Sequence, residues 1–175
     1  ADELKKYIAT LPPEEVNPFI ENLNMYANFS HGTHVAGIAS KGNPEAKILA
    51  ARLTFPYENI PAPPTLENSE NWAKMYKNTV QYFQDNHVKV VNMSWGYSQN
   101  SYEALLSMNG VGENEEERKA LAKKLFTIEK DALYAAIKDA SEILFVVAAG
   151  NANNDVDFAN NIPTGLKLPN LLVVG

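Results

Sequence analysis

The sequence predicts a three-layer α/β fold, in which a parallel sheet has helices on both of its faces. Helical spacing of apolar residues occurs at 69–86 and 128–140. Strands that alternate with helices of this length form crossover units, which build a parallel sheet covered on both sides. Four short apolar runs bounded by turn-forming or polar residues have the length of buried strands; they lie at residues 47–53, 88–94, 143–149 and 171–174.

Length and composition indicate one ordinary globular domain. The 175 residues are 45% hydrophobic and 21% charged, with a net charge of −6, so nucleic acid and anionic membrane surfaces are not expected as partners. No apolar run has the length of a membrane span, and the first residues lack the apolar core of a signal peptide. Because cysteine is absent, thiol nucleophiles, disulfides and thiolate metal sites are excluded.

Residues 31–40 are predicted to form a helix that carries a histidine at its start. Ser30 fits the N-cap position and Gly42 the end of the helix. The partial positive charge of a helix N-terminus disfavours imidazolium, which would leave His31 neutral and able to act as a general base. A solvated or capping histidine is the plain alternative. A metal site with His34 lacks a third ligand at useful spacing.

Two predicted strands end in residues suited to a binding edge. In open parallel sheets, ligands bind beyond the carboxyl ends of the strands. Ser94, Trp95 and Gly96 follow one strand, and the glycine permits close approach of another backbone. Asn151 follows the next strand after Gly150, and its side-chain amide could stabilise an oxyanion. Taken singly, Gly96 and Asn151 are each better explained as turn residues.

The remaining segments are expected at the surface. Residues 1–29 are weakly patterned, with any helix broken at Pro12 and Pro13. Residues 97–126 form a polar excursion from the strand and helix pattern. Its charged stretch at 113–119 is typical of a solvated helix face and does not indicate a binding site.

Three segments together carry a specific family resemblance. They are His-Gly-Thr-His-Val-Ala-Gly-Ile-Ala-Ser at 31–40, Val-Asn-Met-Ser-Trp-Gly at 91–96 and Val-Ala-Ala-Gly-Asn at 147–151. Their sequences and order resemble those of the subtilisin-like serine proteases, the subtilases of peptidase family S8. The resemblance covers about residues 28–175. It implies the central part of a catalytic domain of subtilisin-like fold, with 97–126 as an insertion.

The resemblance implies a role for each candidate site residue. His31 would be the catalytic base, and the second histidine of the same segment would be structural. Asn151 would donate a hydrogen bond to the oxyanion. Ser94, Trp95 and Gly96 would line the primary specificity pocket and pair with the substrate backbone.

Two members of the family's Asp-His-Ser triad are not assigned in this sequence. Asp2 lacks the family's setting, an apolar strand before the aspartate and a small residue and glycine after it, and no Gly-Thr-Ser segment occurs. We therefore expect residues 1–175 to be part of a longer peptidase domain. By themselves they should be inactive, since the nucleophile is missing.

The implied function is a serine endopeptidase that acts on protein or peptide substrates in a secreted or extracytoplasmic location. No cofactor or metal is expected in this chain. The resemblance allows calcium in the complete domain, because calcium stabilises many members of the family. Residues 41–46 hold one carboxylate, so no calcium site is expected there. The stretch at 153–157 has enough oxygen ligands for a weak calcium site, but a solvated loop is the preferred interpretation. The alternatives are a catalytically inactive relative that binds peptides, and an unrelated parallel α/β binding protein. The sequence contains no glycine-rich phosphate loop.

Overall fold

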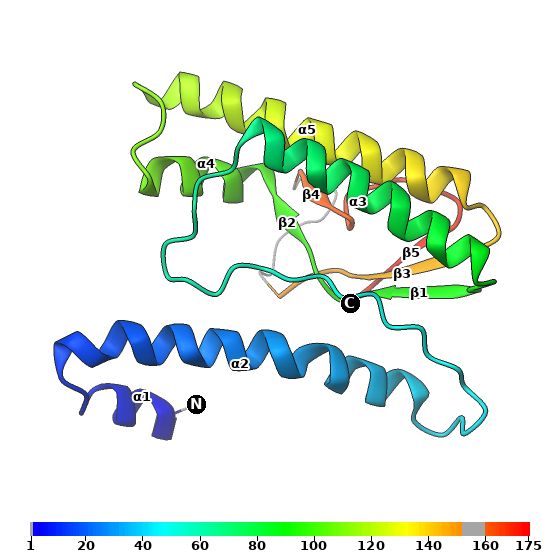
Figure 1. Ribbon diagram of the computed structural model, residues 1–175, viewed down its shortest axis with the longest axis horizontal. Coiled ribbons are helices and arrows are strands. Elements are labelled where there is room, and N and C mark those ends of the chain that lie inside the picture. Colours follow the sequence, from blue (N-terminus) through cyan, green and yellow to red (C-terminus); the bar gives the residue numbers. More distant parts are fainter. Residues whose placement is uncertain (1, 152–159) are drawn as a thin grey trace. The chain divides into compact units, whose positions relative to one another are not determined.

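The computed structural model describes residues 2–151 and 160–175. Contacts within the chain separate two compact units, Ala1–Pro61 and Ala62–Gly175 (Figure 1). Each unit is described by itself. Among the described residues, no helix has both the length and the apolar character needed to cross a membrane.

The first unit consists of two helices followed by an extended segment. α1 (Asp2–Ile8) and α2 (Pro13–Ser40) are separated at Pro12, and the fixed φ of Pro13 suits the first position of a helix. The rings of Tyr7 and Phe19 pack against each other with centroids 5.3 Å apart. Neither helix contains a fully buried residue. The described part of residues 1–29 is therefore surface structure, as the sequence predicts.

The predicted buried strand at residues 47–53 is wrong. These residues have no regular secondary structure, and all of them except Leu53 are exposed. The residues after Leu53 are bound to side chains of α2; for example, Asn28 Nδ2 donates a hydrogen bond to the Phe55 carbonyl at 3.3 Å. A strand is stable only where a neighbouring backbone satisfies its polar groups. None of the strands in the described residues pairs with this segment.

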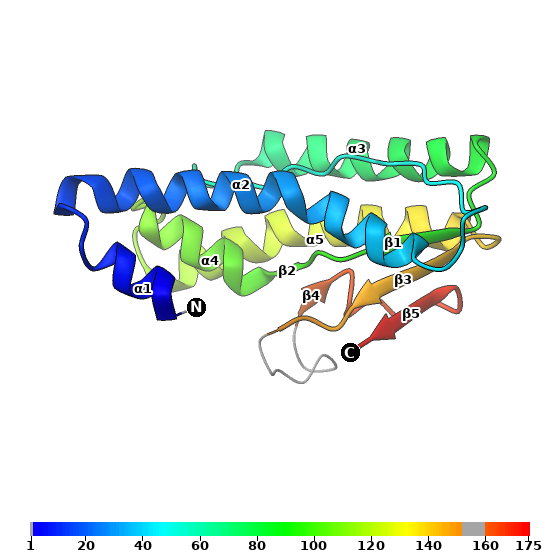
Figure 2. The same cartoon turned by 90° about the horizontal axis from the view of Figure 1, so that it is seen from below.

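The second unit is built around a parallel sheet of three strands. β1 (Val90–Met93), β3 (Leu144–Ala148) and β5 (Leu171–Val174) have the spatial order β1-β3-β5. Two long helices, α3 (Leu66–Asp85) and α5 (Glu115–Asp139), pack against the sheet (Figures 1 and 2). The sequence predicts a three-layer α/β fold with helices on both faces of a parallel sheet; of this, the mixed α/β class with a small parallel sheet packed by helices is confirmed. The core between the sheet and the two helices α3 and α5 includes Val80, Phe83, Met93, Leu133, Ile137, Phe145 and Val147.

The two faces of this sheet differ in their burial. Successive side chains of a strand point to opposite faces, and Phe145 is 1% exposed while its neighbour Leu144 is 41% exposed. Val90 on β1 and Leu172 on β5 are exposed like Leu144. Within the second unit, α3 and α5 therefore cover one face of the sheet, and apolar side chains lie open on the other.

Residues 97–126 are not the polar excursion that the sequence predicts. They contain β2 (Tyr97–Ser98), α4 (Gln99–Met108) and the first half of α5. β2 pairs in antiparallel fashion with β4 (Asn161–Ile162). The helix expected from residue 128 thus begins at Glu115. Five side chains of this segment lie in the core: Tyr102, Leu106, Ala122, Leu125 and Phe126.

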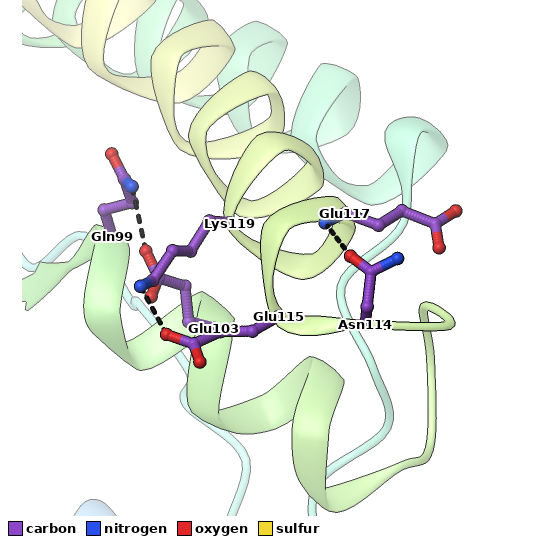
Figure 3. A network of polar contacts seen from close by, with 6 residues as sticks. All are labelled: Gln99, Glu103, Asn114, Glu115, Glu117 and Lys119. Atoms are coloured by element: carbon purple, nitrogen blue, oxygen red, sulfur yellow. Dashed lines mark hydrogen bonds and ion pairs between the residues drawn. The ribbon is translucent and has the colours of Figure 1, made fainter.

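The charged stretch at 113–119 forms the exposed start of α5, as predicted (Figure 3). Asn114 caps the helix, since its Oδ1 accepts a hydrogen bond from the Glu117 backbone N–H at 2.9 Å. Lys119 forms an ion pair with Glu115 one turn earlier. This hydrogen-bonded contact lowers the pKa of Glu115, and the positive charge of Lys119 adds to the effect.

The core of the second unit contains a buried carboxylate, Glu129 on α5, which is 1% exposed. Its Oε1 accepts a hydrogen bond from the Tyr102 hydroxyl at 2.5 Å, and its Oε2 accepts one from the Tyr97 hydroxyl. The hydroxyl oxygens of Tyr76 and Tyr97 are 2.6 Å apart. Because the single proton of Tyr97 is directed to the carboxylate, Tyr76 is the donor in this contact. We call these four residues the Glu129 cluster.

Burial controls the protonation of the Glu129 cluster. Desolvation raises the pKa of Glu129 above its ordinary value of 4.5, although the hydrogen bonds from Tyr102 and Tyr97 act in the opposite direction. The Ser69 hydroxyl lies near the carboxylate but outside strict hydrogen-bond geometry. Desolvation is also the main cause that raises the pKa of all three tyrosines. At neutral pH the phenols are therefore protonated donors.

We expect Phe145→Ala to lower the free energy of unfolding of the second unit by about 3–5 kcal/mol, because it removes a large buried side chain and leaves a cavity. Leu144→Ala, one residue away on the exposed face, should cost less than about 1 kcal/mol. Urea denaturation followed by tryptophan fluorescence measures both, since the two tryptophans of the chain, Trp72 and Trp95, lie in this unit. Equal losses for the two variants would contradict the assigned faces.

Stability should also depend on pH through Glu129. Because its pKa is raised on folding, the folded state binds the proton more tightly, so this group stabilises the fold most below pH 4.5. Its contribution falls as the pH rises through the raised pKa. Glu129→Gln does not titrate. The unfolding free energy of the native chain, relative to that of Glu129→Gln, should therefore decrease from about pH 4.5 upward; a constant or increasing difference would sink this account.

Candidate functional site

The two segments predicted to form a binding edge lie at the same end of the sheet. β1 and β3 are neighbouring parallel strands, with Met93 opposite Val147. The carboxyl ends of these two strands lie at the same end of the sheet, which we call its binding edge (Figure 1). Residues 94–96 follow β1 directly, and Gly150 and Asn151 follow β3 after Ala149. The edge predicted from the sequence is therefore present.

Asn151 is exposed at this edge, on a short segment whose base is fixed by hydrogen bonds. The Ala149 N–H donates to the Val174 carbonyl at 2.8 Å. The Thr164 hydroxyl donates to the Ala148 carbonyl at 2.9 Å. Gly150 has a φ of 98°, a conformation that side chains rarely adopt. The turn that presents Asn151 thus depends on glycine. The stretch at 153–157 that was considered for calcium lies outside the described residues.

Ser94 and Gly96 each lie against another residue of this chain. The Ser94 Oγ accepts a hydrogen bond from Asn92 Nδ2 at 2.9 Å. A Cβ added to Gly96 would lie 3.1 Å from the carbonyl oxygen of Ile162. The close backbone approach that the sequence suggested at Gly96 is thus made here by the chain's own segment at β4. Pairing of Gly96 with a substrate stays a prediction.

Trp95 connects this edge with the core. Its ring is half-buried and stacks on Tyr76, with centroids 5.9 Å apart and planes inclined by 5°. It also stacks on Tyr97, at 6.2 Å and 20°. Both tyrosines belong to the Glu129 cluster. The indole of the predicted substrate segment therefore lies against Tyr97, whose hydroxyl donates to the buried carboxylate, and against Tyr76, whose hydroxyl is bonded to that of Tyr97.

The Glu129 cluster was missed in the sequence analysis. Tyr76 and Tyr97 lie 21 residues apart, and Tyr102 and Glu129 lie 27 residues apart. The available signal is the spacing of Ala122, Phe126 and Glu129, which continues the apolar face of α5 through a glutamate. A carboxylate on the apolar face of a helix indicates a buried polar network.

His31 does not lie in the first turn of a helix, so that prediction is wrong. α2 begins at Pro13 and continues through His31 to Ser40. Ser30 is not the N-cap; its hydroxyl donates to the Ala27 carbonyl at 3.3 Å, as serines inside helices do. The influence of a helix N-terminus fades within one turn, so it does not extend from Pro13 to His31.

The two imidazoles of this segment, His31 and His34, are exposed on α2. His31 belongs to the first unit, whereas residues 94–96 and Asn151 belong to the second. The described residues contain no group of three or more histidines, aspartates or glutamates that could hold a metal ion. The role of His31 as a base stays a prediction, as do the roles of the four other candidate residues.

Comparison with known proteins identifies the family. The sequence model of the subtilase family, peptidase S8, matches residues 16–175, which include the histidine segment and both strand ends. Neither a curated protein nor a solved structure matches the chain. The match is continuous across both units and extends over most of the sequence. The chain therefore belongs to the subtilase family of serine peptidases.

Proposed function

We propose that this chain contributes the general base, a substrate-binding segment and an oxyanion donor to a serine endopeptidase. His31 is the base, Ser94, Trp95 and Gly96 bind the substrate, and Asn151 is the oxyanion donor. The substrates are proteins or peptides, and the location is extracytoplasmic. The reaction also needs the family's serine and aspartate, which no residue of this chain supplies.

The observation that carries the proposal is the parallel pairing of β1 with β3. This pairing brings residues 94–96 and Asn151 to one edge, so a peptide lying along the first segment could direct a carbonyl toward the second. An exposed amide on a turn fixed at Gly150 suits an oxyanion donor, because a donor held in place needs no reorganisation during the reaction.

In the proposed reaction, the serine hydroxyl of the complete enzyme attacks the scissile carbonyl carbon while His31 accepts the hydroxyl proton. The carbonyl π electrons move to oxygen, and the Asn151 amide N–H donates to that oxyanion. The tetrahedral intermediate collapses, the C–N bond breaks, and His31 gives its proton to the leaving amine. Water then releases the acyl group by the same steps, with His31 again as base and acid.

We expect His31→Ala, in the complete protein, to lower kcat for peptide hydrolysis by roughly a million-fold; this magnitude is that of histidine removal in subtilisin, the namesake of the family. His34→Ala, on the same exposed stretch of α2, is the matched control and should lower kcat far less. Cleavage of a chromogenic peptide by purified variants measures both. Retention of activity by His31→Ala would overturn the assignment.

Asn151→Ala should lower kcat roughly 10²–10³-fold with little change in KM, because the oxyanion forms only after substrate has bound; the magnitude again comes from subtilisin. Asn170→Ala is a suitable comparison, since Asn170 Nδ2 donates to three backbone carbonyls at 3.0 to 3.1 Å and has a structural role. It should lower stability and leave kcat of the folded enzyme nearly unchanged. Equal kcat for Asn151→Ala and native enzyme would refute the oxyanion role.

Two further measurements separate this proposal from the peptide-binding alternative. They use the complete chain, with the family's serine and aspartate segments present. If it binds the peptide but does not cleave it, the protein is an inactive relative. Isothermal titration with the uncleaved peptide and product analysis by mass spectrometry distinguish the two functions.

A further inference from the structure

We propose that Glu129 is a positioning residue for the substrate-binding segment at residues 94–96, acting through Tyr76, Tyr97 and the ring of Trp95. The inference rests on the proposed function for its effect on catalysis. Its structural part, the control of Trp95 by Glu129, can be tested without it. Glu129 itself touches no substrate in this scheme.

The first step of the argument concerns the hydroxyl groups. One carboxylate accepts the protons of Tyr97 and Tyr102, and Tyr97 in turn accepts the proton of Tyr76. A hydrogen bond to a buried charged acceptor is stronger than one between neutral groups. Removal of the carboxylate would leave buried phenol groups without their acceptor, so the tyrosines would have to move to find new partners.

The second step concerns the rings. Trp95 stacks on both Tyr76 and Tyr97 with nearly parallel planes. Tyr97 also stacks on Tyr102, at 5.8 Å and 27°, and meets the edge of Phe126 at 6.2 Å. A shift of Tyr97 cannot be absorbed locally, because these neighbours are close-packed. It would be transmitted to the indole of Trp95.

The third step concerns the backbone. Trp95 is the middle one of the three residues assigned to the substrate, and Tyr97, the first residue of β2, follows this segment and pairs with Ile162 of β4. The segment is thus held on one side by the indole and on the other by a short strand pair. Neither contact involves the reacting groups. Both depend on the position of Tyr97, whose hydroxyl is bound to Glu129.

The structural test uses the 175-residue chain with Trp72→Phe, in which Trp95 is the sole tryptophan. Glu129→Leu should shift the emission of Trp95 to longer wavelength and increase its quenching by acrylamide. Glu129→Gln has the same shape and keeps one acceptor oxygen, while its NH2 group donates to a tyrosine hydroxyl that turns to accept. It keeps both tyrosines paired and should restore most of the native spectrum. Tyr134→Phe, which removes an exposed hydroxyl on α5, is the matched control and should change neither quantity.

If far-UV circular dichroism shows that Glu129→Leu does not fold, Tyr97→Phe takes its place. It retains the stacked ring and removes only the hydroxyl that joins Tyr76 to Glu129. It should alter the Trp95 spectrum in the same direction. A native Trp95 spectrum in every folded variant of Glu129 and Tyr97 would overturn the inference.

The catalytic test uses the complete enzyme and a peptide substrate. Glu129→Leu should raise KM about tenfold while kcat changes less than about twofold, because the segment binds substrate before and during the reaction alike. A merely structural role gives another pattern: unfolded molecules reduce the active fraction and hence kcat, and leave KM unchanged. Restoration of KM by Glu129→Gln supports positioning, and a loss of kcat alone refutes it.

The two tests fail separately. If the native enzyme cleaves no peptide, the proposed function fails, and the Trp95 measurements still decide whether Glu129 controls the segment. If the enzyme is active but Trp95 and KM are unaffected by Glu129→Leu and Tyr97→Phe, the positioning role fails and the proposed function stands.

Discussion

Parallel pairing of β1, β3 and β5 is the constraint on which the second unit depends. Two parallel strands can be neighbours only if the chain returns to the same end of the sheet between them. Between β1 and β3, α4 and α5 make that return, and α5 packs beside α3 over the sheet. As a result, the carboxyl ends of the strands meet at one edge. The candidate residues of this unit share a location because the topology requires it.

The Glu129 cluster shows how this core accommodates a charge. An isolated carboxylate in an apolar interior is strongly disfavoured, yet here both oxygens accept phenol protons. The phenols come from α4, from β2 and, through Tyr97, from α3. Since every donor belongs to a different element, the network has its full set of bonds only when these elements are correctly assembled. It therefore favours one arrangement of the elements around residues 94–96 over alternatives with similar apolar burial.

Strong local patterns made part of this structure predictable. α3, β1, β3 and β5 follow directly from their apolar spacing, and two glycines and an asparagine marked the strand ends. The errors arose where local and tertiary signals disagree. A serine before His31 imitates an N-cap within a longer helix. Residues 47–53 have the composition of a strand, but no strand of the described residues pairs with them. Charged residues around 113–124 concealed the core face of α5. The Glu129 cluster joins residues too distant in sequence for any short pattern to predict.

The open face of the sheet has a consequence for handling the protein. Val90, Leu144 and Leu172 are exposed on neighbouring strands, and no described residue of the second unit buries them. Contiguous apolar surface of this kind promotes self-association in water. β1 and β5 are also the edge strands of the described sheet and present unpaired backbone groups. The solubility of residues 62–175 as a separate fragment is therefore governed by this surface, and charged substitutions at Val90 and Leu172 are the direct means of improving it.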